Sequence, residues 1–238
     1  MSLLTIVQNV CGRTNIPVPS SVMGTTTDAQ VLQLLRLLEE EGNDLCDRGP
    51  WQALTNEFTL TTIASEDQGA MTSIATNGFR SIKNGTFFDR TDTLPIHGPL
   101  SDFEWQDRKA RNVSGPRYYY RLRGDHLLVN PVPVAGHIWA AEYLSKNWIL
   151  GADGTTYRQY FLLDSDTILL PEELVLMGLR WRWKKEKGFA YDEDFRTYEM
   201  QVKSALGRDG GKPVINMAGD THQHRPGIIV PEYSWNLV

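Results

Sequence analysis

Cysteine is scarce in this sequence, with only Cys11 and Cys46 among 238 residues. Both fall in segments whose apolar spacing predicts helices. Two thiols so placed form neither a disulfide framework nor the four ligands of a structural zinc site. We therefore expect the protein to be made and assembled in a reducing, intracellular environment.

Long apolar runs are also missing. No segment approaches the roughly 18 to 20 consecutive apolar residues that a membrane-spanning helix needs. Residues 1–13 lack the basic region and the apolar stretch of a secretory signal peptide. These absences predict a protein that is soluble where it is made and has no membrane partner.

Positive charge is in the minority. The chain has 24 Lys and Arg against 29 Asp and Glu, a net charge of −5, so as a whole it is not attracted to phosphate backbones or anionic lipid. Any contact with nucleic acid must then be local. The hydrophobic content of 41% is ordinary for a folded globular chain.

Catalytic and cofactor motifs are absent. Residues 207–213 approach a phosphate-binding loop, but one residue is missing between the glycines, and Pro213 stands where a hydroxyl is needed. No nucleophile elbow, metalloprotease helix or paired-cysteine motif occurs. His222 and His224 offer two metal ligands without a third at a fixed spacing. We therefore predict no catalytic residues, no metal site, no cofactor and no enzymatic activity.

Two helices are predicted at the start of the chain. Apolar residues recur at helical spacing from Leu3 to Val10, and Gly12 with the proline-containing residues 17–19 should end that helix. Thr27 and Gln30 form a capping box for the second helix. Its apolar stripe comprises Val31, Leu34, Leu35, Leu38 and Leu45, and it should end at residues 49–50. We interpret the acidic run at residues 39–41 as a solvated helix face.

The period changes near residue 57, where apolar and polar residues alternate as in a strand. Turn signals then separate short strand-like runs, and Ser101 with Glu104 forms a capping box for a short helix ending at Arg111. Residues 118–145 read as an antiparallel meander with a turn at residues 124–125.

A helix hairpin is predicted next. Pro171 begins a helix that runs to Lys187, Gly188 stops it, and a second helix starts near Asp192. The predicted fold class is therefore α+β: a helical bundle from residues 1–56 and 171–208, an inserted antiparallel β-rich domain at 57–170, and an extended C-terminal tail at 209–238.

Two basic and aromatic segments are candidates for contact with a partner. In residues 180–187, Arg180, Arg182, Lys184 and Lys185 suit phosphate and two tryptophans suit base stacking. The competing interpretation, which we favour, is structural: tryptophans two residues apart point to divergent helix faces, so at least one packs in the core, and cations suit a helix C-terminus. In residues 118–123, Tyr118, Tyr120, Arg121 and Arg123 indicate a subunit interface more than a DNA-facing strand.

The tail is too apolar to be merely solvated and too short to fold alone, which predicts that it docks on something. Its candidate anchors are Ile228, Ile229, Val230, Tyr233, Trp235 and Leu237.

The chain resembles the head-to-tail adaptor proteins of podophages over most of residues 1–218. The opening SLLTIVQNVCGRTNIPVPSSV, the segment following it through Trp51, and the later strings GPLSDFEWQ, HLLVNPVP, AAEYLSKNWIL and DGGKPVINM carry the resemblance. It implies a structural virion protein that forms a ring, usually of twelve copies, under the portal. The partners implied are the portal, neighbouring copies and a tail nozzle or hub, with DNA as transiting cargo.

The resemblance further implies that the tail reaches the portal, and that the protein occupies the head–tail junction of the virion after assembly in the host cytoplasm. Two alternatives remain open at this stage. One is a nucleic-acid-binding module that uses residues 180–187. The other is a tail-associated cell-wall hydrolase, which would need a carboxylic acid of raised pKa in a cleft, with Glu39, Glu104, Glu142 and Glu172 as unranked candidates.

Overall fold

The computed structural model describes residues 1–24, 28–111, 115 and 117–210. Its helices are α1 (Leu3–Thr14), α2 (Ala29–Arg48), α3 (Met71–Ile74), α4 (Asp102–Arg111), α5 (Glu172–Glu186) and α6 (Asp192–Asp209), with a 3-10 turn at Gln52–Leu54. Its strands are β1 (Thr55–Thr61), β2 (Asp67–Ala70), β3 (Phe79–Ile82), β4 (Phe88–Asp89), β5 (Leu94–Pro95), β6 (Tyr119–Arg123), β7 (His126–Asn130), β8 (Ile138–Ser145), β9 (Ile149–Leu150), β10 (Tyr157–Arg158) and β11 (Thr167–Ile168). The predicted α+β class is confirmed. Of the predicted tail at 209–238, Asp209 is the last residue of α6, and residues 211–238, with the anchors from Ile228 to Leu237, lie outside the described residues.

Two helix ends differ from the sequence prediction. Helix α1 continues through Gly12 and ends where Asn15 adopts a left-handed conformation with φ of 56°. Helix α2 is capped by Asp28, whose carboxylate accepts the Gln30 N–H at 2.8 Å, and the predicted cap Thr27 lies outside the described residues. Carboxylates and hydroxyls both cap helices, so adjacent Thr and Asp residues leave the start ambiguous by one position.

Other local predictions are confirmed. Around α4, the Ser101 Oγ accepts the Glu104 N–H, and the Glu104 carboxylate accepts the Ser101 N–H at 2.9 Å. Gly188 has φ of 73° just after α5, as a helix stop requires. Gly124 and Asp125 both have positive φ, which gives the β6–β7 hairpin the turn that suits the twist of paired strands.

The strands form two larger sheets and one small one. Strand β8 is central to the first sheet, where it pairs with β1, β3 and β4 in antiparallel register, and β5 extends the sheet beyond β4. The second sheet has the order β2-β7-β6, and the small sheet has the order β10-β9-β11. Every pairing within these sheets is antiparallel, as predicted for the meander.

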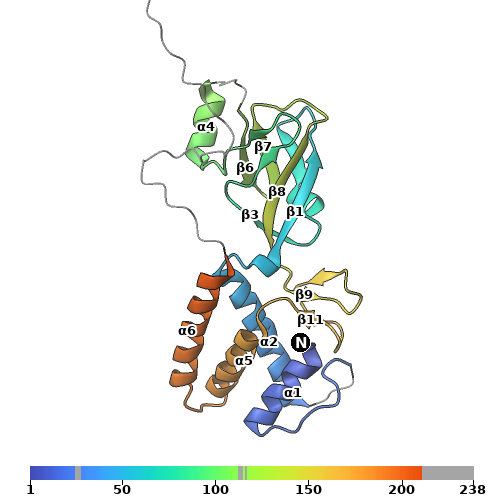
Figure 1. Ribbon diagram of the computed structural model, residues 1–238, viewed down its shortest axis with the longest axis vertical. Coiled ribbons are helices and arrows are strands. Elements are labelled where there is room, and N and C mark those ends of the chain that lie inside the picture. Colours follow the sequence, from blue (N-terminus) through green and yellow to red (C-terminus); the bar gives the residue numbers. More distant parts are fainter. Residues whose placement is uncertain (25–27, 112–114, 116, 211–238) are drawn as a thin grey trace, which may run out of the picture.

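Two hydrophobic cores lie at opposite ends of an elongated molecule (Figure 1). One core gathers α1, α2, α5 and α6, and α5 packs against each of the other three. The other core lies between the two larger sheets and centres on Phe58, Phe87 and Trp139. Trp148, Ile149 and the residues around β11 belong to the helical core, although they precede the predicted boundary at 170. The division of the chain into domains stays a prediction.

Candidate functional site

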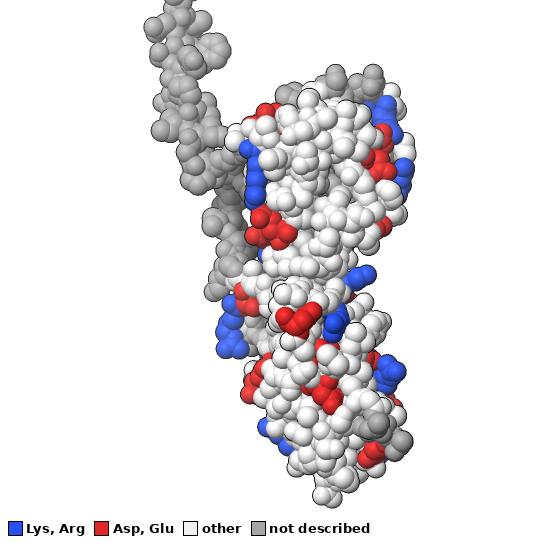
Figure 2. Space-filling model, turned by 90° about the vertical axis from the view of Figure 1, so that its right-hand side faces the viewer, with Lys and Arg blue, Asp and Glu red and all other residues white. Residues whose placement is uncertain are grey.

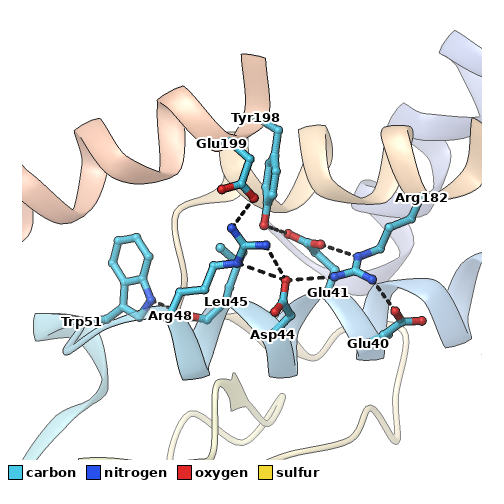
Figure 3. A network of polar contacts seen from close by, with 9 residues as sticks. All are labelled: Glu40, Glu41, Asp44, Leu45, Arg48, Trp51, Arg182, Tyr198 and Glu199. Atoms are coloured by element: carbon cyan, nitrogen blue, oxygen red, sulfur yellow. Dashed lines mark hydrogen bonds and ion pairs between the residues drawn. The ribbon is translucent and has the colours of Figure 1, made fainter. Parts of the chain in front are cut away.

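Charged side chains meet where α2 contacts α5 and α6, as Figure 3 shows. Glu41, Asp44 and Arg48 stand three and four residues apart on α2 and therefore share one face of the helix. Arg182 reaches them from α5, and Tyr198 and Glu199 reach them from α6. We call this set, together with Glu40, the interhelix ion-pair network.

Arg182 is the centre of the network. Its Nε donates to the Glu41 carboxylate at 2.6 Å, its Nη2 lies 2.9 Å from Asp44 Oδ2, and its Nη1 pairs with Glu40. Only 11% of the Arg182 side chain is exposed. Planar guanidinium groups present several donors in fixed directions, which is why one arginine serves three carboxylates here.

Glu41 is fully buried, with 0% of its surface exposed. Burial raises the pKa of its carboxyl to about 7, against the opposing effects of hydrogen bonds from Arg182 and from the Tyr198 hydroxyl. Gly178 of α5 gives this carboxylate its space, because a Cβ at that position would stand 2.0 Å from Glu41 Oε1. The close contact of α2 with α5 therefore depends on a glycine.

Arg48 extends the network to α6. Its guanidinium lies 2.9 Å from Asp44 Oδ2, pairs with Glu199, and stands over the Tyr198 ring at 5.2 Å from the centroid. Burial and the neighbouring Glu41 raise the pKa of the Tyr198 phenol, so it stays protonated and donates. The network thus connects three helices through groups that satisfy one another.

A raised carboxyl pKa is often a sign of catalysis, but here the geometry is structural. Glu41 is closed to solvent, and both of its oxygens are engaged by Arg182 and Tyr198. Of the four acids considered for hydrolysis, Glu104 has its pKa lowered by Ser101. Glu142 pairs with Lys83, Glu172 with the N-terminal amine, and Glu39 with Arg36. No arrangement of an acid in a cleft emerges among these groups.

The interpretation of residues 39–41 as a solvated face was wrong. Glu41 is fully buried and Glu39 nearly so, while only Glu40 is largely exposed. The reason is tertiary: Arg182, distant in sequence, supplies the charge that makes burial of Glu41 tolerable. Glu41, Tyr198 and Gly178 were missed as site residues for the same reason.

The basic segment of α5 is used within the subunit. Trp181 and Trp183 are both buried, and Arg180 and Lys184 both pair with Asp194 at the start of α6. Lys185 lies 5.9 Å from the Trp181 ring. Arg182, a candidate for contact with a partner, is instead enclosed by the network, so that assignment is corrected.

The candidate strand residues divide between core and surface. Tyr120 is 1% exposed and lies in the β core, where burial raises the pKa of its phenol to about 12. It offers no surface to a partner, which corrects its assignment. Arg121 pairs with Asp102, Tyr118 is half-buried with its ring centroid 5.2 Å from that of Trp139, and Arg123 is exposed. A partner role for the strand thus stays a prediction for Tyr118, Arg121 and Arg123.

Charged and aromatic side chains here hold the chain's own helices and strands together in an α+β fold. The family model described as SU10 adaptor protein matches residues 1–225, and the chain belongs to this family. It is thereby a phage head–tail adaptor, a structural protein of the virion that joins other virion components. No curated protein matches the chain. None of the helices in the described part of the chain combines the length and apolarity needed to cross a bilayer.

Proposed function

We propose that this adaptor forms a ring, of twelve copies, between the portal and the tail of a podophage. The ring extends the DNA channel below the portal and provides the platform to which a tail nozzle or hub attaches. The observation that carries this proposal is the match of residues 1–225 to the adaptor family. The resemblance of the sequence to podophage adaptors supports its finer details.

A ring needs two different patches on each subunit, because a head-to-tail contact joins unlike surfaces. Aromatic and arginine side chains are enriched in such interfaces. Tyr118, Arg121 and Arg123 on and beside strand β6 are our candidates for one patch, and Lys185, on the helical part, is a candidate for the other. Strand β6 and helix α5 lie toward opposite ends of the elongated subunit (Figure 1).

DNA is proposed as transiting cargo, not as a bound ligand. Basic and acidic side chains are interspersed over the face in Figure 2, and the net charge is −5. A wall without concentrated positive charge does not retain phosphate. A ring whose channel is lined chiefly by Arg and Lys contradicts this part of the proposal.

The segment beyond residue 210 is proposed to dock on the portal through Ile228, Ile229, Val230, Tyr233, Trp235 and Leu237. Buried aromatic anchors are each worth about 2 kcal/mol or more in an interface, and a ring repeats them. Truncation after Gly211 therefore leaves a folded subunit that does not dock. Normal docking of the truncated chain refutes this role.

The test is electron microscopy of the purified protein, alone and mixed with its cognate portal. Rings on the portal with the full chain, and none with the truncated chain, are expected. A full-length protein that stays monomeric beside the portal and shifts DNA in a gel in a salt-sensitive manner favours a nucleic-acid-binding module instead.

A further inference from the structure

A second cluster of charged groups lies at the end of the β-rich part, away from the interhelix network. Strand β4 pairs with the beginning of β8, in a register that sets Asp89 opposite Trp139. This pairing brings Asp89, Asp92 and His137 together, and their side chains offer three metal-ligand atoms within 4.8 Å of one another. Imidazole nitrogen and carboxylate oxygen are the ligands that first-row divalent metals accept.

The distances suit a small cation. His137 Nδ1 lies 2.9 Å from Asp89 Oδ2 and 3.6 Å from Asp92 Oδ2. In a tetrahedral site with bonds of about 2.0 to 2.1 Å, ligand atoms stand about 3.3 Å apart. The observed separations lie on either side of that value, so small side-chain rotations bring all three atoms to a common centre.

One side chain of the cluster, Asp89, is already oriented by contacts outside the cluster. Asp89 is fully buried, and its Oδ1 accepts the backbone N–H groups of Thr91 and Asp92, which leaves Oδ2 directed at His137. The fully buried indole of Trp139 lies beside this carboxylate, and its N–H acts on Asp89 as a hydrogen-bond donor. Together with the two backbone N–H groups, this contact holds the Asp89 side chain in one orientation, as outer hydrogen bonds do for metal-ligating carboxylates.

We propose that Asp89, Asp92 and His137 bind one divalent transition-metal ion such as Zn²⁺, with a fourth position left to water. The ion ties the turn after β4 to the first residue before β8, across 45 residues of chain. Its role is to fix this end of the sheet, where Ile138 is exposed. Binding is a property of the single subunit and does not depend on ring formation or on the portal.

The chain contains a matched control. His126 Nδ1 lies 2.8 Å from Asp67 Oδ2, a His–Asp pair that resembles the His137–Asp89 pair but forms no three-ligand group in the described part of the chain. Asp92 is half exposed, so Asp92→Asn removes one proposed ligand without disturbing the buried Asp89. His222 and His224 lie outside the described residues and are tested separately.

The experiment is calorimetric titration of the full-length, untagged, chelator-treated protein with Zn²⁺, and visible absorption with Co²⁺ as the spectroscopic probe. We expect one ion per chain, and binding at least about tenfold weaker in Asp92→Asn and His137→Gln. His126→Gln and the double variant His222→Gln/His224→Gln should bind like the unmodified chain. Circular dichroism checks that each variant is folded, and Asp92→Asn alone carries the test if His137→Gln is not.

Three outcomes overturn the proposal. The first is no saturable binding below about 100 μM Zn²⁺, an affinity too weak for a resident ion. The second is unchanged binding in Asp92→Asn. The third is binding that disappears in His222→Gln/His224→Gln, which would place the ion on the C-terminal residues.

Discussion

Replacement of Arg182 by Met tests whether the interhelix ion-pair network stabilises the fold. Methionine keeps an unbranched side chain but has no positive charge. The fully buried Glu41 therefore loses its cationic partner, and Asp44 and Glu40 each lose one ion pair. Breaking a buried ion pair by removing one partner costs about 3 to 5 kcal/mol, because the remaining charge is uncompensated. We expect a loss in this range at pH 8. Asp44 keeps Arg48 as a partner, so the loss comes mainly from Glu41.

The loss should depend on pH with a definite sign. The folded-state pKa of Glu41, about 7, is above its ordinary value of 4.5, so between these values the folded protein holds a proton that the unfolded chain releases. The stability from this proton is fully present below pH 4.5 and is lost as the pH rises through 7. Without Arg182 the folded-state pKa rises further. The variant should therefore lose less stability, relative to the unmodified protein, at pH 5 than at pH 8.

The assay is urea unfolding, followed by tryptophan fluorescence, at both pH values. Arg180→Met is the matched control, since Arg180 is 40% exposed and its ion pair with Asp194 should be worth less than about 1 kcal/mol. The double variant Glu41→Gln/Arg182→Met should recover much of the stability because no buried charge remains unpaired. Equal losses for the two arginine variants at pH 8, or a larger Arg182→Met loss at pH 5, would refute the reasoning.

Two further substitutions test the packing. Gly178→Ala places a Cβ 2.0 Å from Glu41 Oε1 and should lower the free energy of unfolding in urea by about 1 to 3 kcal/mol. The control is Gly207→Ala on α6, whose Cβ meets nothing within 4 Å, so this variant should be as stable as the unmodified protein or more so. Equal effects of the two substitutions would contradict this. Asp166→Ala removes a fully buried carboxylate that accepts three backbone N–H groups of the β9–β11 segment, and should lower stability by about 2 kcal/mol or more, measured by thermal unfolding. The exposed Asp153→Ala should have a smaller effect, and the reverse order would refute the assignment.

Much of the fold was predictable because its signals are local. A capping box around α4, a glycine after α5 and paired positive-φ residues between β6 and β7 each depend on a few adjacent residues. The α+β class follows from the change of apolar period near residue 57. The place of Trp148 and Ile149 in the helical core was not predictable. It depends on how β9 and β11 pack against the helices, and the alternation of apolar and polar residues in these short strands does not indicate that packing.

The network itself left a signal in the sequence. On α2, Leu34, Leu38, Glu41 and Leu45 follow one another at intervals of four, three and four residues, so Glu41 occupies a position of the apolar stripe. A carboxylate in such a stripe predicts a buried partner. The sequence does not identify that partner, because Arg182 and Tyr198 are 141 and 157 residues away.

The cluster of Asp89, Asp92 and His137, which we propose as a metal site, could not be predicted from the sequence. Asp89 and Asp92 are neighbours in sequence, but His137 joins them only through the register of β4 on β8. A shift of one residue would turn the side chains of β4 to the opposite face. Register of this kind is set by cores such as the one around Trp139, and no spacing rule within the sequence reveals it.

The interhelix network explains why a basic, tryptophan-containing helix belongs to a structural protein. A purely apolar contact would let α2 shift along α5, because a leucine one turn away could fill the same space at little cost in free energy. Three carboxylates around one guanidinium, with Gly178 admitting Glu41, are satisfied together in one register only. An adaptor must hold its contact surfaces at a fixed spacing to join other virion components. The cations at Arg180, Arg182 and Lys184 form ion pairs within the subunit that contribute to this fixed spacing.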